Sequence, residues 1–308
     1  MKILVTGAAG MLGRAVTEAW RKRGGDAEFI GIARADVDLR EASAVADAVK
    51  RIAPDVIVHT AARVGGINAN ITAPAEFLSD NLRIDTSVIG AALLAGVEDF
   101  IYLGSSCMYP RDYRQPLVET DVLQAPLEPT NEGYALAKIA GAKLCAYTSR
   151  EHGVNYRVII PSNLYGPQDH FGSTASHLVA AALYKAYLAK RAGDKAIDVW
   201  GDGTARREFT YVGDLAGWIA ENITQVAGWP EMMNVGIGKD YSVREFYEAA
   251  LRVVDYRAEL RFDPSKPAGM KRKLMDSSLA KQHGWDPHTD IDEGMARTYT
   301  GLLESTTM

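Results

Sequence analysis

The sequence predicts an α/β protein built on a doubly wound parallel sheet, followed by a smaller, mixed α/β C-terminal lobe. Short apolar runs alternate with segments of helical periodicity up to about residue 168, which is typical of a parallel sheet covered by helices. A glycine-rich turn at residues 7–13 joins the first apolar run to the first helical segment. Beyond residue 168 this regular alternation of strand and helix patterns ends. A chain of 308 residues is long enough for a large core with one additional lobe.

Composition and charge argue against several classes of protein. A hydrophobic fraction of 47% can supply the core, and a net charge of −5 disfavours a general nucleic-acid binder, although the basic cluster 271–273 could meet phosphates. Two cysteines, Cys107 and Cys145, cannot form a disulfide framework, which indicates a reducing compartment. No signal-peptide pattern or membrane-spanning run is present. We expect a soluble, cytoplasmic protein without membrane or nucleic-acid partners, and we predict no metal site.

The glycine turn stands where a dinucleotide-binding motif requires it. Residues 3–6 form an apolar strand, and apolar residues recur at helical spacing after Gly13. Gly7, Gly10 and Gly13 would let the backbone approach a pyrophosphate, which then lies at the N-terminus of the helix. The spacing is G-x-x-G-x-x-G, and a simple tight turn is the structural alternative. The strand–turn–helix context favours a Rossmann-type cofactor site.

Arg34 bears on the choice of cofactor. It follows a second predicted strand at residues 29–33, where an acidic residue would bind the adenine ribose and an arginine suits a 2′-phosphate. Arg34 therefore favours NADP. An exposed loop arginine is the other interpretation, and Asp36 and Asp38 lie close enough in sequence to leave NAD as an alternative.

A polar loop follows the fourth predicted strand. The expected elements before it are a helix at 42–52, a strand at 55–59, a helix at 74–95 and a strand at 100–103. Ligand sites of open parallel sheets lie at the carboxyl ends of the strands, so Ser105 and Cys107 are candidate site residues. A free thiol is often only a small core hydrophobe; both interpretations stand for Cys107, and Cys145 is expected in the core.

A second pair of candidate residues is Tyr134 and Lys138. If residues 131–141 are helical, the two side chains lie one turn apart on the same face. A cation beside a phenol favours the phenolate, so Lys138 is expected to lower the pKa of Tyr134 and make it a proton donor or acceptor near neutrality. Tyrosine and lysine are common on helix surfaces, so a snorkelling lysine is the alternative that spacing alone leaves open.

The remaining segments predict the domain division. A strand at 157–160 precedes an alanine-rich helix that reaches residue 187, and an apolar helix ending near residue 223 returns to the main sheet. Residues 242–253 are expected to be helical, and residues 272–276 to form a strand or a loop. We expect a dinucleotide-binding domain of residues 1–168 with a return segment at 209–234, and a substrate lobe of residues 169–208 and 235–308.

Several strings of residues together resemble one known family. With Tyr134-x-x-x-Lys138, they resemble the extended short-chain dehydrogenase/reductase family of nucleotide-sugar enzymes, and within it the GDP-L-fucose synthase group. The strings are Thr6-Gly7-x-x-Gly10-x-x-Gly13, Val64-Gly65-Gly66-Ile67, Gly104-Ser105-Ser106-Cys107-Met108-Tyr109-Pro110, Leu127-Glu128-Pro129-Thr130-Asn131-Glu132, Asn163-Leu164-Tyr165-Gly166-Pro167, Ser176-His177 and Arg207-Glu208-Phe209. The likeness therefore runs from Gly7 to about Asp214.

The resemblance implies an NADPH-dependent 3,5-epimerase/4-reductase that converts GDP-4-keto-6-deoxy-D-mannose to GDP-L-fucose. It also implies a homodimer, with the helices at 74–95 and 134–150 at the subunit contact. It implies that Ser105 hydrogen-bonds the keto oxygen, that Tyr134 supplies the proton, and that Lys138 tunes Tyr134 and holds the nicotinamide ribose. Cys107 and His177 would be the acid/base pair of epimerisation, although a helix-start histidine is the simpler interpretation of His177 by itself. The chemistry is reasonable because protons beside a ketone are acidified only when the enolate oxygen is stabilised.

The resemblance also implies the binding residues. For the nucleotide sugar they are Asn163, Lys185, Trp200 and Arg207, and a guanidinium such as that of Arg207 can bridge two phosphate oxygens. Two departures are Ala8-Ala9, where the family often has a basic residue, and Lys185, which stands in place of an arginine. For the cofactor the implied residues are Gly7, Gly10, Met11, Leu12, Gly13, Arg34, Leu39, Ala61, Tyr134, Lys138 and Pro161.

Four alternatives remain open from the sequence. A related GDP-ketosugar, either a 3,6-dideoxyhexose as in colitose synthesis or a heptose, would keep the chemistry and change the sugar. An NAD-dependent nucleotide-sugar 4-epimerase needs only the Ser-Tyr-Lys set, so Cys107 and His177 argue against it. A 4,6-dehydratase would need an Asp-Glu pair that is absent after the strand-end hydroxyl. An NADP-binding redox regulator without turnover is disfavoured by the complete set of candidate catalytic residues.

Overall fold

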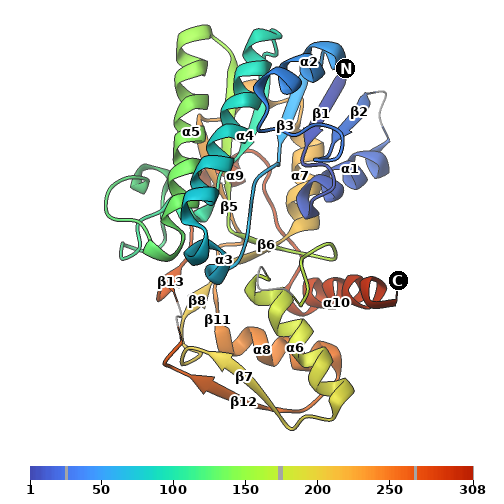
Figure 1. Ribbon diagram of the computed structural model, residues 1–308, viewed down its shortest axis with the longest axis vertical. Helices are drawn as coiled ribbons and strands as arrows, with labels where there is room; N and C mark the ends of the chain where they lie inside the picture. The colour runs from blue at the N-terminus through green and yellow to red at the C-terminus, as the bar shows by residue number, and fades with distance from the viewer. Residues whose placement is uncertain (25–26, 173–175, 267–268, 308) are drawn as a thin grey trace.

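The computed structural model describes residues 1–24, 27–172, 176–266 and 269–307, and its upper part is built around one parallel sheet (Figure 1). The strand order is β10-β5-β4-β3-β1-β2, and every neighbouring pair is parallel. The strands are β1 (Lys2–Thr6), β2 (Glu28–Ile32), β3 (Val56–His59), β4 (Asp99–Leu103), β5 (Asn155–Pro161) and β10 (Met232–Val235). The predicted doubly wound α/β fold is confirmed.

Helices cover both faces of this sheet, because its strands carry apolar residues on both sides (Figure 1). In β1, Leu4 packs into the core under one set of helices, whereas Ile3 and Val5 pack into the core under the other. One set is α2 (Ala42–Ile52), α4 (Pro74–Leu94) and α5 (Glu132–His152). The other set is α1 (Met11–Arg23) and α7 (Val212–Asn222).

The lower lobe, at the bottom of Figure 1, is a separate group of helices and strands. It has its own hydrophobic core. Its helices are α6 (Leu178–Ala192), α8 (Val243–Val254) and α10 (Ile291–Thr307), and its parallel strand pair is β7 (Ala196–Trp200) with β12 (Glu259–Asp263). Small pairings connect the two parts: β6 (Asn163–Tyr165) with β9 (Phe209–Tyr211), and β11 (Tyr241–Ser242), β8 (Arg206–Arg207) and β13 (Arg272–Lys273) in one sheet.

Short elements complete the description. They are the helices α3 (Ile67–Thr72) and α9 (Ser278–Gln282), and the 3₁₀ turns η1 (Ser106–Met108), η2 (Glu119–Asp121), η3 (Pro129–Asn131) and η4 (Val226–Gly228). In the part of the chain that the structure describes, none of the helices has the length and apolar character needed to cross a membrane.

The predicted elements of the upper part match the observed ones to within about two residues. Further along the chain, the alanine-rich helix α6 continues to Ala192, five residues beyond the predicted end at residue 187, because small and apolar residues face the lower core through Ala189. In the segment 272–276, predicted to be a strand or a loop, residues 272–273 form a strand and the rest is irregular apart from an isolated bridge at Met275. Part of the predicted stretch before His177, residues 173–175, lies outside the described residues.

Candidate active site

One large cleft runs between the carboxyl edge of the main sheet and the lower lobe. Its volume is about 1240 Å³, and it is lined by the glycine turn, the loops after the parallel strands, and residues of the lower lobe. Every residue named as a site candidate from the sequence lines this cleft. They are Gly7, Gly10, Met11, Leu12, Gly13, Arg34, Leu39, Ala61, Ser105, Cys107, Tyr134, Lys138, Pro161, Asn163, His177, Lys185, Trp200 and Arg207.

The glycine turn has the geometry of a phosphate cradle. Gly7 has a φ of +73°, and a Cβ there would stand 2.7 Å from the Cα of Ala61, so only glycine fits. Gly10 is the residue before α1, and no side chain caps this end of the helix. Amides of the first helical turn therefore remain to bind an anion. At Gly13 a Cβ would collide with the backbone of Gly7. These features fit the pyrophosphate of a dinucleotide.

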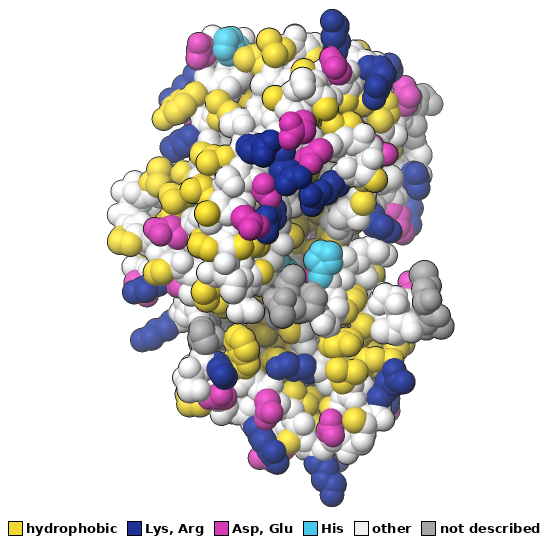
Figure 2. Space-filling model, in the orientation of Figure 1, with side chains coloured by type: hydrophobic (Ala, Val, Ile, Leu, Met, Phe, Trp, Pro, Cys, Tyr) yellow, Lys and Arg dark blue, Asp and Glu magenta, His cyan; other side chains and the backbone are white. Residues whose placement is uncertain are grey.

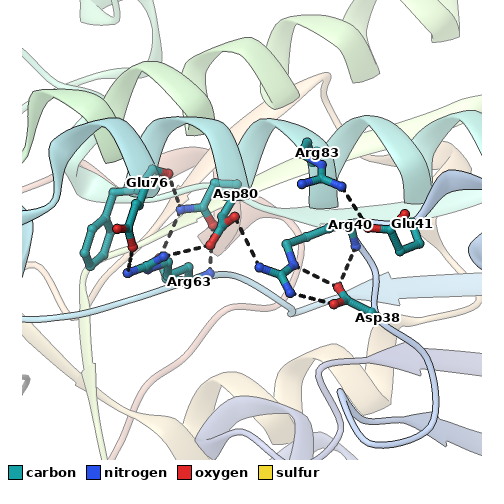
Figure 3. A network of polar contacts seen from close by, with 9 residues as sticks. Asp38, Arg40, Glu41, Arg63, Glu76, Asp80 and Arg83 are labelled. Atoms are coloured by element: carbon teal, nitrogen blue, oxygen red, sulfur yellow. Dashed lines mark hydrogen bonds and ion pairs between the residues drawn. The ribbon is translucent and has the colours of Figure 1, made fainter.

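Arg34 enters the cleft beside a network of ion pairs. Figure 3 shows Arg40 between Asp38 and Asp80, at 2.6 Å and 3.4 Å, and Arg63 reaching the other side of Asp80 at 2.8 Å. In Figure 2, charged side chains of both signs gather on the upper half of the visible face. The hydrogen bonds from Arg40 hold the pKa of the Asp38 carboxyl well below its ordinary value.

Asp36 and Asp38, the two acidic residues that keep NAD as an alternative cofactor, already accept hydrogen bonds within their own loop. Asp38 binds Arg40, and the carboxylate of Asp36 accepts a hydrogen bond from the backbone N–H of Ala33 at 2.8 Å. A carboxylate committed in this way is a poorer acceptor for ribose hydroxyls. Arg34 also lines the cleft, and unlike Asp38 it is a cation that suits a 2′-phosphate.

Tyr134 and Lys138 lie one turn apart on α5, as the spacing predicts, and both line the cleft. The pKa of Tyr134 is nevertheless raised above its ordinary value, mainly by burial, with a smaller opposing effect from a hydrogen bond to Ser105. The prediction that Lys138 lowers the pKa of this phenol is wrong for the structure as it stands. The Lys138 ammonium lies 3.4 Å from the Asp85 carboxylate, which balances its charge.

Cys107 lies in the turn after β4 among polar partners. The amide Nδ2 of Asn131 donates a hydrogen bond to its Sγ at 3.0 Å, and Nζ of Lys273 lies 4.0 Å from the same sulfur. Lys273 is buried, and desolvation lowers its pKa while the nearby Cys107 acts to raise it. A sulfur between an amide donor and a lysine is suited to carrying negative charge, which favours the chemical interpretation of Cys107 over a core role.

His177 immediately precedes α6 and faces the cleft from the lower lobe. Burial lowers its pKa, and the carboxylate of Asp169 opposes this shift. Burial conversely raises the pKa of Asp169, and His177 opposes that shift. An imidazole with a lowered pKa is neutral at physiological pH and can therefore accept a proton.

The remaining candidates lie on the lower wall of the cleft. Arg207 is partly buried, and desolvation lowers its pKa. The ammonium of Lys185 donates to the backbone carbonyl of Asp198 at 2.7 Å and lies 5.9 Å from the ring centroid of Tyr247. Trp200, 49% exposed at the end of β7, presents an aromatic surface. Together they offer cations and a flat apolar face to an anionic, ring-bearing ligand.

The profile of the NAD dependent epimerase/dehydratase family matches residues 3–236, which include the main sheet except for Lys2. The chain belongs to this family. It is 41% identical to the GDP-L-colitose synthase of Yersinia pseudotuberculosis, over 97% of this chain and 96% of that protein. It is 42% identical to the GDP-L-fucose synthase of Azorhizobium caulinodans, over 97% of this chain and 95% of that one.

A solved structure of this epimerase/dehydratase fold is also similar. The GDP-mannoheptose C4 reductase from Campylobacter jejuni with NADP bound superposes with a TM-score of 0.88 at 30% identity, and the alignment covers 98% of both chains. The extended short-chain dehydrogenase/reductase resemblance predicted from the sequence is therefore confirmed.

Three polar residues near the centre of this epimerase/dehydratase site were not predicted. Asn131 belongs to one of the strings that carry the resemblance, but no spacing rule connects it to Cys107. Lys273 belongs to the basic cluster 271–273, which indicated phosphate affinity and not proximity to a thiol. Asp85 lies on the inner face of a helix, where the apolar spacing gave no sign of a buried carboxylate.

Proposed function

We propose that the protein is an NADPH-dependent bifunctional epimerase/reductase that converts GDP-4-keto-6-deoxy-D-mannose to GDP-L-fucose. The observation that carries this proposal is the meeting of two sets of side chains in one cleft: Ser105, Tyr134 and Lys138 for reduction, and Cys107 and His177 for epimerisation. A simple dehydrogenase would need only the first set. The similarity to a GDP-L-fucose synthase over 97% of the chain supports the same conclusion.

The glycine turn and the first turn of α1 would hold the cofactor pyrophosphate, and Arg34 would bind the adenosine 2′-phosphate. Leu39, Ala61 and Pro161 would line the cofactor along the sheet edge. The NADP bound to the similar heptose reductase supports this choice over NAD, as does the engagement of Asp36 and Asp38 within their loop. When bound, NADPH supplies the hydride that reduces the ketone.

Epimerisation would come first. In our proposal His177 and Cys107 face the sugar ring from opposite sides, so that one removes the proton beside the ketone and the other returns a proton to the opposite face of the same carbon. The lowered pKa of His177 suits the role of base. Hydroxyl groups of Ser105 and Tyr134 would stabilise the enolate oxygen.

Reduction at carbon 4 would follow in the same position. The Tyr134 hydroxyl would deliver its proton to the keto oxygen, while Ser105 hydrogen-bonds that oxygen and Lys138 holds the nicotinamide ribose. The raised pKa of Tyr134 keeps the phenol protonated, which is the state a proton donor needs. Burial of the phenol would therefore favour its role as proton donor in the reductive step.

We propose that the substrate is bound mainly by residues of a lobe comprising 169–208 and 235–308. Arg207 and Lys185 would contact the diphosphate, Trp200 would pack against a ring of the substrate, and Asn163 would hydrogen-bond its phosphate or ribose. The cofactor would be held by residues 1–168, with 209–234 returning to the main sheet.

A second candidate keeps the chemistry and changes the sugar. The similarity to a GDP-L-colitose synthase, at 41% identity, favours a 3,6-dideoxy-4-ketohexose as the competing substrate. Removal of one hydroxyl from the ring would leave the GDP contacts and the carbon 4 chemistry unchanged. Relative values of kcat/KM for the two ketosugars decide between these candidates.

The test is to incubate the purified protein with NADPH and a panel of GDP-, UDP- and dTDP-linked 4-ketosugars and to follow the loss of NADPH absorbance. We expect turnover with GDP-4-keto-6-deoxy-D-mannose and a product whose NMR spectrum is that of GDP-L-fucose. No NADPH oxidation with any GDP-ketosugar would overturn the assignment. Preference for the 3,6-dideoxy substrate would establish the second candidate.

We also propose a cytoplasmic homodimer formed through the outer faces of α4 and α5, which lie side by side. Leu136 and Tyr147 on α5 are 41% and 55% exposed, so this face offers apolar contact area. Light scattering after size exclusion should give twice the 33.5 kDa of one chain. Leu136→Glu should convert the dimer to monomer, and a wild-type monomer would contradict the proposal.

A further inference from the structure

A chain of buried hydrogen bonds extends from Lys138 into the sheet, away from the cleft. The Lys138 ammonium lies 3.4 Å from Asp85 Oδ2, and Asp85 Oδ1 lies 3.0 Å from His59 Nε2. His59 Nδ1 lies 2.6 Å from the hydroxyl of Thr6, and the hydroxyl of Tyr102 donates to Asp85 Oδ2 at 2.5 Å. Each of these residues is at most 2% exposed. They come from five different elements: α5, α4, β3, β1 and β4.

Burial and hydrogen bonding together determine the charge of each residue in this assembly. Burial lowers the pKa of His59, so its imidazole is neutral and carries one proton. The opposing hydrogen bonds and the Lys138 charge lower the pKa of Asp85 despite its burial, so it is ionised and accepts a hydrogen bond from Nε2–H of His59. His59 Nδ1 then accepts from the Thr6 hydroxyl. The net charge of this assembly is zero, with Lys138 balanced by Asp85.

We propose that Asp85 is a positioning residue of the reductive step: its carboxylate, oriented by His59, keeps the Lys138 ammonium charged and fixed in the wall of the cleft. This inference rests on the proposed function, in which Lys138 holds the nicotinamide ribose. Asp85 does not line the cleft and therefore acts only through Lys138. His59 in turn holds Asp85 in place from the neighbouring strand.

Electrostatics require such a partner because Lys138 is buried. Desolvation lowers the pKa of Lys138, and Asp85 is the largest influence that opposes this shift. Among the described residues that face this assembly, Cys145 and Tyr102 have pKa values raised by burial and stay neutral, as does Tyr134. Asp85 is thus the carboxylate that sustains the cation. Without it, the lysine would favour its uncharged form.

The assembly is suited to holding charge and not to transporting protons. Its far end, Thr6, is 1% exposed and donates to a neutral imidazole, so the chain of hydrogen bonds ends inside the sheet. A proton lost by Tyr134 would therefore have to be replaced through the cleft. The buried residues act by keeping the Lys138 ammonium charged in the wall of the cleft.

The effect of removing this carboxylate has a definite sign. A nearby negative charge makes both Lys138 and Tyr134 harder to deprotonate, and Asp85 acts in this direction on each. Asp85→Asn keeps the size of the side chain and an oxygen acceptor but removes the charge. The proton-donating state of the site should then be lost at lower pH than in the wild type.

The experiment compares Asp85→Asn with the wild type in the pH dependence of NADPH-driven ketosugar reduction. We expect kcat to fall about tenfold, with KM for the ketosugar changed less than about twofold, and the alkaline limb of the kcat profile to move to lower pH. Asp214→Asn is the matched control, since Asp214 is a buried carboxylate that binds Thr289 and does not line the cleft. It should lower thermal stability and leave the alkaline limb unchanged.

A second measurement does not require turnover. NMR of protein with ¹⁵N-labelled lysine, with the Lys138 signal assigned through Lys138→Arg, reports whether Nζ carries three protons. At pH 7 the wild type should show an ammonium, and Asp85→Asn should lose it at a lower pH than the wild type. This readout stays valid if the enzyme reduces none of the ketosugars, so failure of the proposed function and failure of this inference are distinguishable.

Two results would overturn the inference. One is an Asp85→Asn variant that loses stability like Asp214→Asn but keeps both the alkaline limb and the Lys138 protonation of the wild type. The other is a neutral Lys138 amine in the wild type at pH 7, a measurement that needs no variant to fold. Either outcome would assign Asp85 to the structure of the sheet alone.

Discussion

The side chain of Asn131 donates a hydrogen bond from Nδ2 to the sulfur of Cys107 over 3.0 Å. Asn131 is the residue immediately before α5, the helix that carries Tyr134 and Lys138. The start of one helix therefore orients the thiol proposed for epimerisation and the phenol proposed for reduction. In the proposed function, both chemistries would then act on one bound sugar without movement of the substrate between sites.

Asn131→Ala should impair epimerisation more than reduction. The lost amide donor both positions the sulfur and stabilises negative charge on it, and a hydrogen bond to a charged group contributes about 1.5–3 kcal/mol. We expect deuterium exchange from D₂O into the ketosugar to slow about tenfold or more. Equal slowing of exchange and of NADPH oxidation with a pre-epimerised ketosugar would contradict this role.

Cys107→Ser should abolish epimerisation and partly retain reduction at carbon 4. A serine hydroxyl keeps the shape but ionises far less readily, so proton transfer at carbon should fall by about 10²–10⁴-fold. Mass spectrometry of products formed in D₂O measures the exchange. Cys145→Ser is the control, because Cys145 is a buried residue of α5 that does not line the cleft. A comparable loss of both activities in Cys107→Ser would remove the proposed division of roles.

Tyr134→Phe should abolish reduction while NADPH still binds. The phenylalanine ring keeps the packing but cannot supply a proton, so kcat should fall by about 10²–10⁴-fold. Stopped-flow absorbance measures hydride transfer, and quenching of protein fluorescence measures NADPH affinity. Tyr147→Phe, on the exposed side of the same helix, should match the wild type. Unimpaired reduction by Tyr134→Phe would exclude this residue as the proton donor.

Arg34→Ala should weaken NADPH binding and leave NADH binding nearly unchanged. The guanidinium is expected to contact only the 2′-phosphate, and the loss of one such charge-assisted contact corresponds to about a tenfold or larger rise in KM for NADPH. Arg83→Ala provides a control of equal charge change, since Arg83 is 53% exposed and pairs with Glu41 (Figure 3). The proposed contact is refuted if KM rises equally for both cofactors.

The stability of the protein should depend on pH through Glu208. Burial raises the pKa of this carboxyl from 4.5 to about 7, although it accepts hydrogen bonds from the backbone N–H groups of Gly238 and Met275. The native state then binds more protons than the unfolded state between these values. The free energy of unfolding should therefore fall as pH rises from about 4.5 to about 7.

Urea unfolding at several pH values checks this expectation. The decrease attributable to Glu208 should be on the order of 2 kcal/mol across that window, and Glu208→Gln should flatten it. Glu293→Gln, at a residue 48% exposed on α10, should not change the slope. A slope that Glu208→Gln leaves unaltered would show that this carboxyl titrates normally in the native protein.

The elements and the cleft residues that could be predicted from the sequence depend on short-range signals. The glycine turn, the strand-end Ser105 and Cys107, and the four-residue spacing of Tyr134 and Lys138 each follow from local backbone geometry. The end of α6 was placed too early because contacts with the lower core, and not local pattern, determine how far that helix continues. The sign of the Tyr134 pKa shift was missed for a similar reason, since burial outweighs a neighbouring cation whose charge is already balanced.

By itself, the sequence determined the parallel α/β architecture, the family resemblance and a first group of residues that line the cleft. The architecture, the glycine turn and the strand-end residues depend on signals that act over a few residues, and the other named cleft residues are implied by the family resemblance. Only the tertiary structure decided which distant residues support them: Lys273 near Cys107 across 166 positions, and His59 on Asp85 across 26. Such pairs form because packing brings separate strands and helices together and excludes water. The spacing of residues along the chain predicts neither effect.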